Sequence, residues 1–166
     1  MSRELCVGCG AAVPRVDGPT HRYMAASPGC WAIYGEVTAR SPTEPGFRPV
    51  HQYVVDTYAV QHPGTPSNQA IQSVAVHLIS LYAHLILGHR LERAPALLQR
   101  ALRQRGVFRW LPPPSFDDAL TVIHVHDVTD PHVYVGQVHA WAQSVWQVWA
   151  PYHETVAEWF DAYVAQ

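Results

Sequence analysis

Residues 51–88, HQYVVDTYAVQHPGTPSNQAIQSVAVHLISLYAHLILG, form the stretch that decides the fold. Their apolar spacing predicts a first helix over residues 51–62, which ends before the strong breaker Pro63-Gly64. Good capping residues at Pro66-Ser67-Asn68 begin a second helix that runs to about Gly88. Because the link is short, we expect the two helices to form an antiparallel hairpin.

The second helix is apolar almost all round, which is typical of a central, buried helix. Its principal polar stripe consists of Ser73, His77, Ser80 and His84. An unsatisfied polar group in such a place costs roughly 1–3 kcal/mol, so these side chains need partners. In the expected hairpin, residue 77 lies across from about residue 54, which brings His77 within reach of Asp56 or His51.

These polar residues suggest two interpretations. Each can be a core histidine or acid that simply bonds to a neighbour. Alternatively, His51, Asp56 and His77 line a buried cleft that binds or transforms a small molecule, with His153, on the inward stripe of the last helix, as a further candidate. A neutral histidine can act as a general base or a metal ligand, so these four are the candidate catalytic residues and a second divalent metal could bind among them. Whether the protein is an enzyme stays open at this stage.

The segments before and after the helical hairpin in the sequence differ from it in composition. The first 50 residues are rich in Gly, Pro and Cys, and only residues 31–40 could hold a short helix. After the hairpin come an Arg-rich helix over residues 91–105, a helix of about twenty residues from Asp130-Pro131, and a last helix after Pro151. The β-prone runs 107–111 and 120–125 could pair as a small hairpin.

Three cysteines stand out in the N-terminal segment. Cys6-Val7-Gly8-Cys9-Gly10 has the form of a zinc knuckle, and Cys30 offers a third thiolate. A tetrahedral ion then needs one more ligand, and His21 is the histidine nearest in sequence, with His62 and His51 as competitors. We therefore predict structural zinc at Cys6, Cys9, His21 and Cys30; the alternative is three unrelated thiols. A redox function of C-x-x-C would need a βαβ context, which is not visible here.

The composition of the chain reduces the number of possible functions further. The chain has 166 residues, 48% of them hydrophobic and 14% charged, with 11 His and a net charge of −2. This balance argues against general nucleic-acid binding, and no apolar run has the signature of a membrane helix or a secretory signal. We expect a cytoplasmic protein. The sequence contains no Gly-rich phosphate loop, G-x-S-x-G elbow or H-E-x-x-H motif.

Several of these segments together resemble a bacterial family known only as a domain of unknown function. The segments that carry the resemblance are Cys6–Gly10, His21-Arg22-Tyr23, Ser27–Trp31, His51–Gly64, Gln72–Leu78 and Trp141–Trp146. The resemblance covers most of the chain and implies no established activity. It singles out Cys6, Cys9, His21, Cys30, His51, Asp56, His62 and His77, but not His124 or His126. A looser similarity to DinB-type helical bundles rests on helix count and buried histidines.

The sequence thus predicts a single mainly α domain over residues 1–166. Its parts are a loop-rich zinc-knuckle segment over residues 1–50 and a helical bundle over residues 51–166, with a small β-hairpin near 107–125. The first functional hypothesis is a zinc-binding protein with a small-molecule cleft. The alternative is a non-catalytic, zinc-stabilised interaction module that docks a partner, or a second copy in a homodimer, through its Trp-rich or Arg-rich helix.

Overall fold

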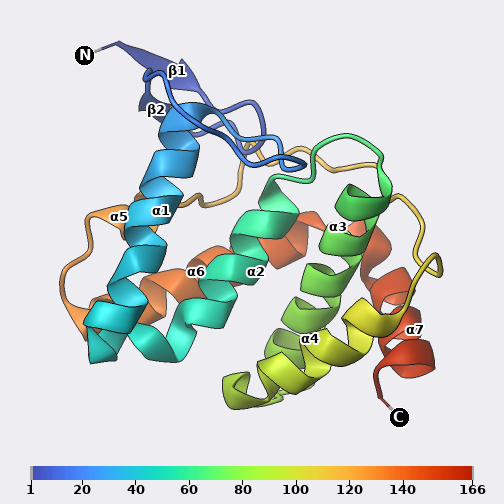
Figure 1. The fold of residues 1–166 in the computed structure, drawn as a ribbon. Helices are drawn as coiled ribbons and strands as arrows, with labels where there is room; N and C mark the ends of the chain where they lie inside the picture. Colours follow the sequence, from blue (N-terminus) through green and yellow to red (C-terminus); the bar gives the residue numbers. More distant parts are fainter. Residues whose placement is uncertain (1, 166) are drawn as a thin grey trace.

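The helical hairpin at the centre of the molecule forms as the sequence predicts. A computed structural model describes residues 2–165, in which α2 (His51–Gln61) and α3 (Asn68–Leu81) run antiparallel and pack against each other (Figure 1). The Ser67 side chain caps α3 by accepting a hydrogen bond from the Ala70 N–H. Gly64 makes the turn between the helices with φ +73°, a conformation that favours glycine. α3 continues directly into a π-helical turn, Tyr82–Ile86.

The second layer of the core is α6 (Pro131–Val148), which passes behind α2 (Figure 1). Asp130 begins this helix as an N-cap, accepting hydrogen bonds from the N–H groups of His132 and Val133. The tryptophans of this region, Trp141, Trp146 and Trp149, are all buried. The Trp-rich face is therefore core, and it does not supply the docking surface that the interaction hypothesis considered.

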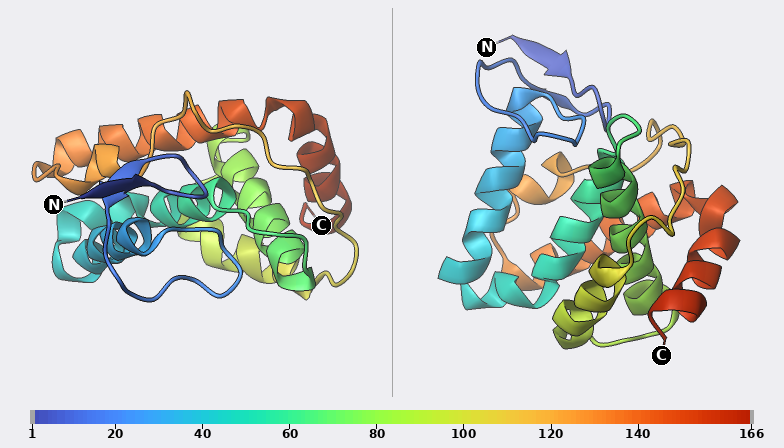
Figure 2. Two further views of the ribbon diagram at one scale, coloured as in Figure 1. Left: turned by 90° about the horizontal axis from the view of Figure 1, so that it is seen from above. Right: turned by 45° about the vertical axis from the view of Figure 1, so that its right-hand side comes forward.

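Two further helices cover the other side of α3. α4 (Ala94–Arg103) follows a short 3-10 turn, Leu91–Arg93, and α7 (His153–Tyr163) follows the 3-10 turn Ala150–Tyr152. Both pack against α3, so that α3 is enclosed by α2, α4, α6 and α7 (Figure 2). This position explains why the sequence of α3 is apolar almost all round.

The N-terminal segment is more regular than expected. β1 (Arg3–Leu5) and β2 (Ala12–Pro14) form an antiparallel hairpin with Glu4 opposite Val13. The helix expected over residues 31–40 is α1 (Pro28–Thr43), and the 3-10 turn Pro45–Val50 connects it to α2. Pro28 occupies the first turn of α1, where no N–H donor is needed, and Pro42 lies inside the helix, next to its last residue.

The prediction of a β-hairpin near residues 107–125 is wrong. Within residues 2–165 the two strands are β1 and β2, while residues 107–122 are an extended connection without strand pairing. Pro112-Pro113-Pro114 removes three N–H donors from that connection, which prevents a ladder. The last part of the predicted hairpin is instead a short helix, α5 (Ile123–His126).

One helical stretch satisfies the length and hydropathy expected of a membrane span. It is Asn68–Ile86, which comprises α3 and its π-helical turn, with a mean hydropathy of 1.2. In the fold, 56% of this window is buried among the other helices. A buried core helix passes the same length and hydropathy criteria, so the stretch is weak evidence for a membrane segment.

The fully buried Gln61 provides a test of the core. Its Nε2 donates to the Leu120 carbonyl at 2.8 Å, and its Oε1 accepts from the Trp141 indole N–H at 3.0 Å. We expect Gln61→Leu to lower the free energy of unfolding by about 2–4 kcal/mol, because two buried polar groups lose this partner. Urea denaturation followed by tryptophan fluorescence measures this change. The exposed Gln137→Leu is the control, and equal stability of the two variants would contradict the prediction.

Candidate metal centre

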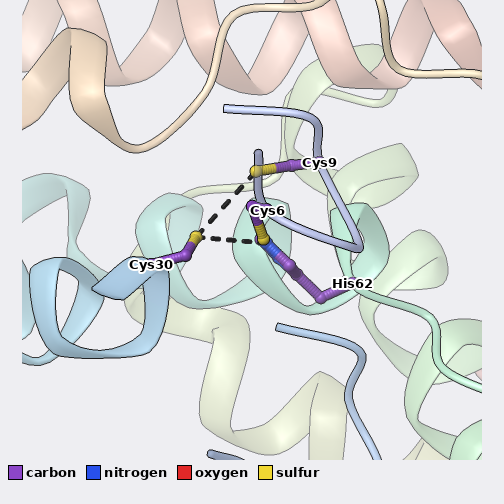
Figure 3. A group of neighbouring side chains, drawn as sticks. All are labelled: Cys6, Cys9, Cys30 and His62. Carbon is purple, nitrogen blue, oxygen red and sulfur yellow. Dashed lines mark hydrogen bonds between the residues drawn. The ribbon is translucent and has the colours of Figure 1, made fainter. Parts of the chain in front are cut away.

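Three cysteines and one histidine from distant parts of the chain meet beside the end of α2 (Figure 3). Cys6 and Cys9 lie in the loop between β1 and β2, Cys30 lies in the first turn of α1, and His62 directly follows α2. Their ligand atoms all lie within 4.8 Å of one another, and all four residues are buried. The group could therefore hold a metal ion.

The distances within this Cys3His group match a tetrahedral site. The Cys9 and Cys30 sulfurs are 3.9 Å apart, and the Cys30 sulfur is 3.5 Å from His62 Nε2. Metal–sulfur bonds of about 2.3 Å in a tetrahedron place two sulfurs about 3.8 Å apart. The cysteines are free thiols, and 3.9 Å is far longer than a disulfide bond. The donor set and its spacing fit a single four-coordinate ion.

The loop holding the first two cysteines has the hydrogen bonding of a metal knuckle. The backbone N–H of Cys9 bonds to the Cys6 sulfur, and that of Ala11 bonds to the Cys9 sulfur. Gly10 closes the turn with φ +73°, and its N–H donates to the Cys6 carbonyl at 2.9 Å. The peptide groups thus orient both sulfurs and stabilise their negative charge.

His62 is oriented for ligation by its other ring nitrogen. Nδ1 donates to the Tyr58 carbonyl at 2.7 Å, which leaves the lone pair of Nε2 directed at the Cys30 sulfur. Metal-binding histidines commonly have such a bond to a carbonyl, because it fixes the tautomer. The tyrosine ring also stacks on the imidazole, with centroids 3.9 Å apart.

The close approach of the three sulfurs makes them electrostatically interdependent. The hydrogen bond between Cys30 and Cys6 lowers the pKa of the Cys6 thiol and raises the pKa of the Cys30 thiol. Thiolates at this separation repel one another, so protons stay on some of the sulfurs unless a cation neutralises the group. A divalent ion supplies that charge when bound.

The histidine of the Cys3His group is not His21, which the sequence predicts as the fourth ligand. His21 lies outside it: its Nδ1 accepts a hydrogen bond from the Tyr23 N–H at 3.3 Å, and its ring contacts Trp31. His62, one of the two alternatives, takes the position instead. Nearness in sequence favoured His21, but the turn after α2 brings His62 against the knuckle, where Gly8 leaves room for its ring.

Asp56 and His77 meet at a second polar cluster, between α2 and α3. The Asp56 carboxylate is fully buried and accepts hydrogen bonds from His77 Nδ1 at 2.7 Å, Gln52 Nε2 at 2.7 Å and Ser80 Oγ at 2.6 Å. The charge of Asp56 also acts on Tyr34. Burial of the Tyr34 phenol, followed by the nearby Asp56 charge, raises the pKa of that phenol to about 12. Sequence reasoning paired Asp56 with His77 but did not assign Gln52 to the cluster, although its i,i+4 spacing from Asp56 was a usable signal.

The other two candidate catalytic residues lie elsewhere. His51 Nδ1 bonds to Ser41 Oγ at 2.9 Å, and so joins the start of α2 to α1. His153 Nε2 donates to the Trp146 carbonyl at 2.8 Å, and its ring stacks on that tryptophan. Both contacts lie at helix ends, and these hydrogen bonds do not join His51 or His153 to the Asp56–His77 cluster. His124 and His126 also have different partners: His126 bonds to Glu36, whereas His124 does not.

The fold and the Cys3His group define a mainly helical protein with a candidate metal centre at its N-terminal end. A model for a family of unknown function, DUF5946, matches residues 4–150, and the chain belongs to this family. No curated protein and no solved structure matches the chain significantly.

Gly8 tests whether the close packing of the knuckle matters for the centre. A Cβ at this position would collide with the Ala25 carbonyl oxygen and lie 2.6 Å from His62 Cδ2. We expect Gly8→Ala to displace the His62 ring and weaken Zn²⁺ binding at least tenfold, measured by competition with a chromogenic chelator. Gly35→Ala on exposed α1, where a Cβ meets nothing within 4 Å, is the matched control. Equal affinities in the two variants would refute the role of Gly8.

Proposed function

We propose that the protein is a zinc-binding protein in which a structural Zn²⁺ is held by Cys6, Cys9, Cys30 and His62. The observation that carries this proposal is the convergence of these four ligand atoms within 4.8 Å. Three thiolates and one imidazole are a donor set typical of structural zinc, because soft sulfur ligands suit this ion. All four ligands come from the protein, so no coordination position is left for a substrate.

The ion would join three parts of the chain that lie far apart in the sequence. The knuckle loop, the first turn of α1 and the end of α2 all supply ligands, and both Leu5 and Val7 at the knuckle are largely exposed. Metal binding would add a cross-link to the apolar contacts of this segment, in which Ala11 and Val13 are buried in the core.

Ligand variants test the zinc proposal. We expect the purified protein to hold one Zn²⁺ and to lose thermal stability when a chelator removes it. His62→Ala should weaken binding by more than about 100-fold, because loss of a ligand exceeds the 10–100-fold effect of outer-shell changes. The control is His21→Ala, which should keep the metal. Metal analysis and chelator competition measure both effects. An unchanged affinity in His62→Ala, or loss in His21→Ala, would contradict the assignment.

We further propose that Asp56 and His77 form the working part of a small-molecule site. The observation that favours it is the tautomer: with Nδ1–H donated to Asp56, the lone pair of His77 resides on Nε2. The His77 side chain is 20% exposed, while Asp56 is fully buried. A buried carboxylate that orients a histidine is the arrangement by which enzymes prepare a general base. The same pair would bind a ligand that carries an N–H or O–H donor.

An activated ester tests whether His77 acts as a base. In the hydrolysis of p-nitrophenyl acetate, Nε2 would take a proton from water as the water oxygen attacks the ester carbon and p-nitrophenolate leaves. We expect His77→Gln, which can still donate to Asp56, to lower the protein-dependent rate at least tenfold. His132→Gln, at an exposed position on α6, is the control. Equal rates in the two folded variants would favour a purely structural Asp56–His77 pair.

A further inference from the structure

Tyr58 is not a member of the Cys3His group, but it contacts this group in three ways. Its hydroxyl donates to the Cys30 sulfur at 3.5 Å, its carbonyl accepts from His62 Nδ1 at 2.7 Å, and its ring lies parallel to the His62 ring. The side chain is fully buried in α2. One residue therefore contacts two of the four ligands.

The hydroxyl has a particular place among the hydrogen bonds to sulfur. The Cys6 and Cys9 sulfurs accept from peptide N–H groups of the knuckle, whereas Cys30 lies outside the knuckle in the first turn of α1. Tyr58 provides the corresponding side-chain donor for Cys30. Each of the three sulfurs thus has an N–H or O–H donor that would offset part of the thiolate charge.

The surroundings hold the tyrosine in this position. Its ring is stacked between Tyr34 of α1, at a centroid distance of 3.9 Å, and His62, also at 3.9 Å. The Tyr58 hydroxyl is buried together with its ring and donates to the Cys30 sulfur from this fixed position. A ring fixed on both faces cannot turn its hydroxyl away from the sulfur without disturbing α1.

We propose that Tyr58 is a positioning residue of the metal centre, which sets the electron density on the Cys30 thiolate and the orientation of the His62 ring. This inference rests on the proposed zinc site and adds a function for a residue that is not a ligand. Withdrawal of charge by the hydroxyl would make Cys30 less nucleophilic and the bound ion less prone to loss by thiol oxidation. The stacked ring and the carbonyl would hold His62 ready for ligation.

Tyr58→Phe separates the hydroxyl from the ring, because it keeps the stack and removes only the O–H donor. We expect Zn²⁺ affinity to fall by about 10–100-fold. With Co²⁺ as the probe, the sulfur-to-cobalt charge-transfer band should move to lower energy, because the thiolate becomes more electron-rich. The spectral shift reports on the sulfur itself, which a general loss of stability would not move.

Tyr134→Phe is the matched control, since its hydroxyl is buried without a hydrogen-bond partner in the described part of the chain and lies away from the centre. Replacing Tyr58 by 3-fluorotyrosine, a stronger donor, should move the cobalt band to higher energy. If Tyr58→Phe and Tyr134→Phe give the same affinity and the same spectrum, the inference is overturned while the zinc proposal stands. If the wild-type protein binds neither Zn²⁺ nor Co²⁺, both proposals fail.

Discussion

The rest of the structure depends on how the polar side chains of α2 find partners inside the core. Four fully buried polar residues of this segment have partners elsewhere in the fold: Asp56, Tyr58, Gln61 and His62. Each points to a different part of the molecule: α3, the first turn of α1, α6 with the preceding connection, and the knuckle loop. Since a buried polar group without a partner is costly, these contacts fix the position of every neighbouring element relative to α2.

This arrangement joins the two candidate sites through a single helix. Asp56 and Tyr58 are two residues apart, so their side chains leave α2 on different faces. Tyr34 of α1 stacks on Tyr58, and its phenol also feels the charge of Asp56. The metal centre would hold the first turn of α1, and α1 holds this tyrosine. The geometry around Asp56 is therefore connected to the geometry around the metal without a shared ligand.

The elements that the sequence predicts best are those with long apolar periodicity. The hairpin of α2 and α3 is confirmed, and the pairing of Asp56 with His77 follows from its antiparallel geometry. The confirmed membership in a family of unknown function covers most of the chain. The cysteine group was also visible in the C-x-x-C spacing, because local knuckle geometry is encoded within five residues.

The errors arise where tertiary contacts decide. The choice between His21 and His62 depends on which loop reaches the knuckle, and neither periodicity nor spacing encodes that distance. Residues 107–111 are β-prone but have no strand to pair with beside three prolines. His51 and His153 each bond to a neighbour at a helix end instead of joining Asp56 and His77. The helical spacing of the sequence predicts the direction in which a side chain leaves its helix, but not the residue to which that side chain bonds.

The positions of Cys6, Cys9, Cys30 and His62 along the chain determine which parts of the molecule must come together for the group to form. His62 and Cys30 are attached to helices, and the Tyr58 contacts hold them near each other once α1 has packed on α2. The knuckle, in contrast, is a short local loop that is 56 residues from His62, and closing a loop of that length costs chain entropy. Contacts within the helical part alone thus bring Cys30 and His62 together, and the N-terminal hairpin adds the other two members of the group. An ion bound by all four residues would therefore require that α1, α2 and the N-terminal hairpin have packed against one another.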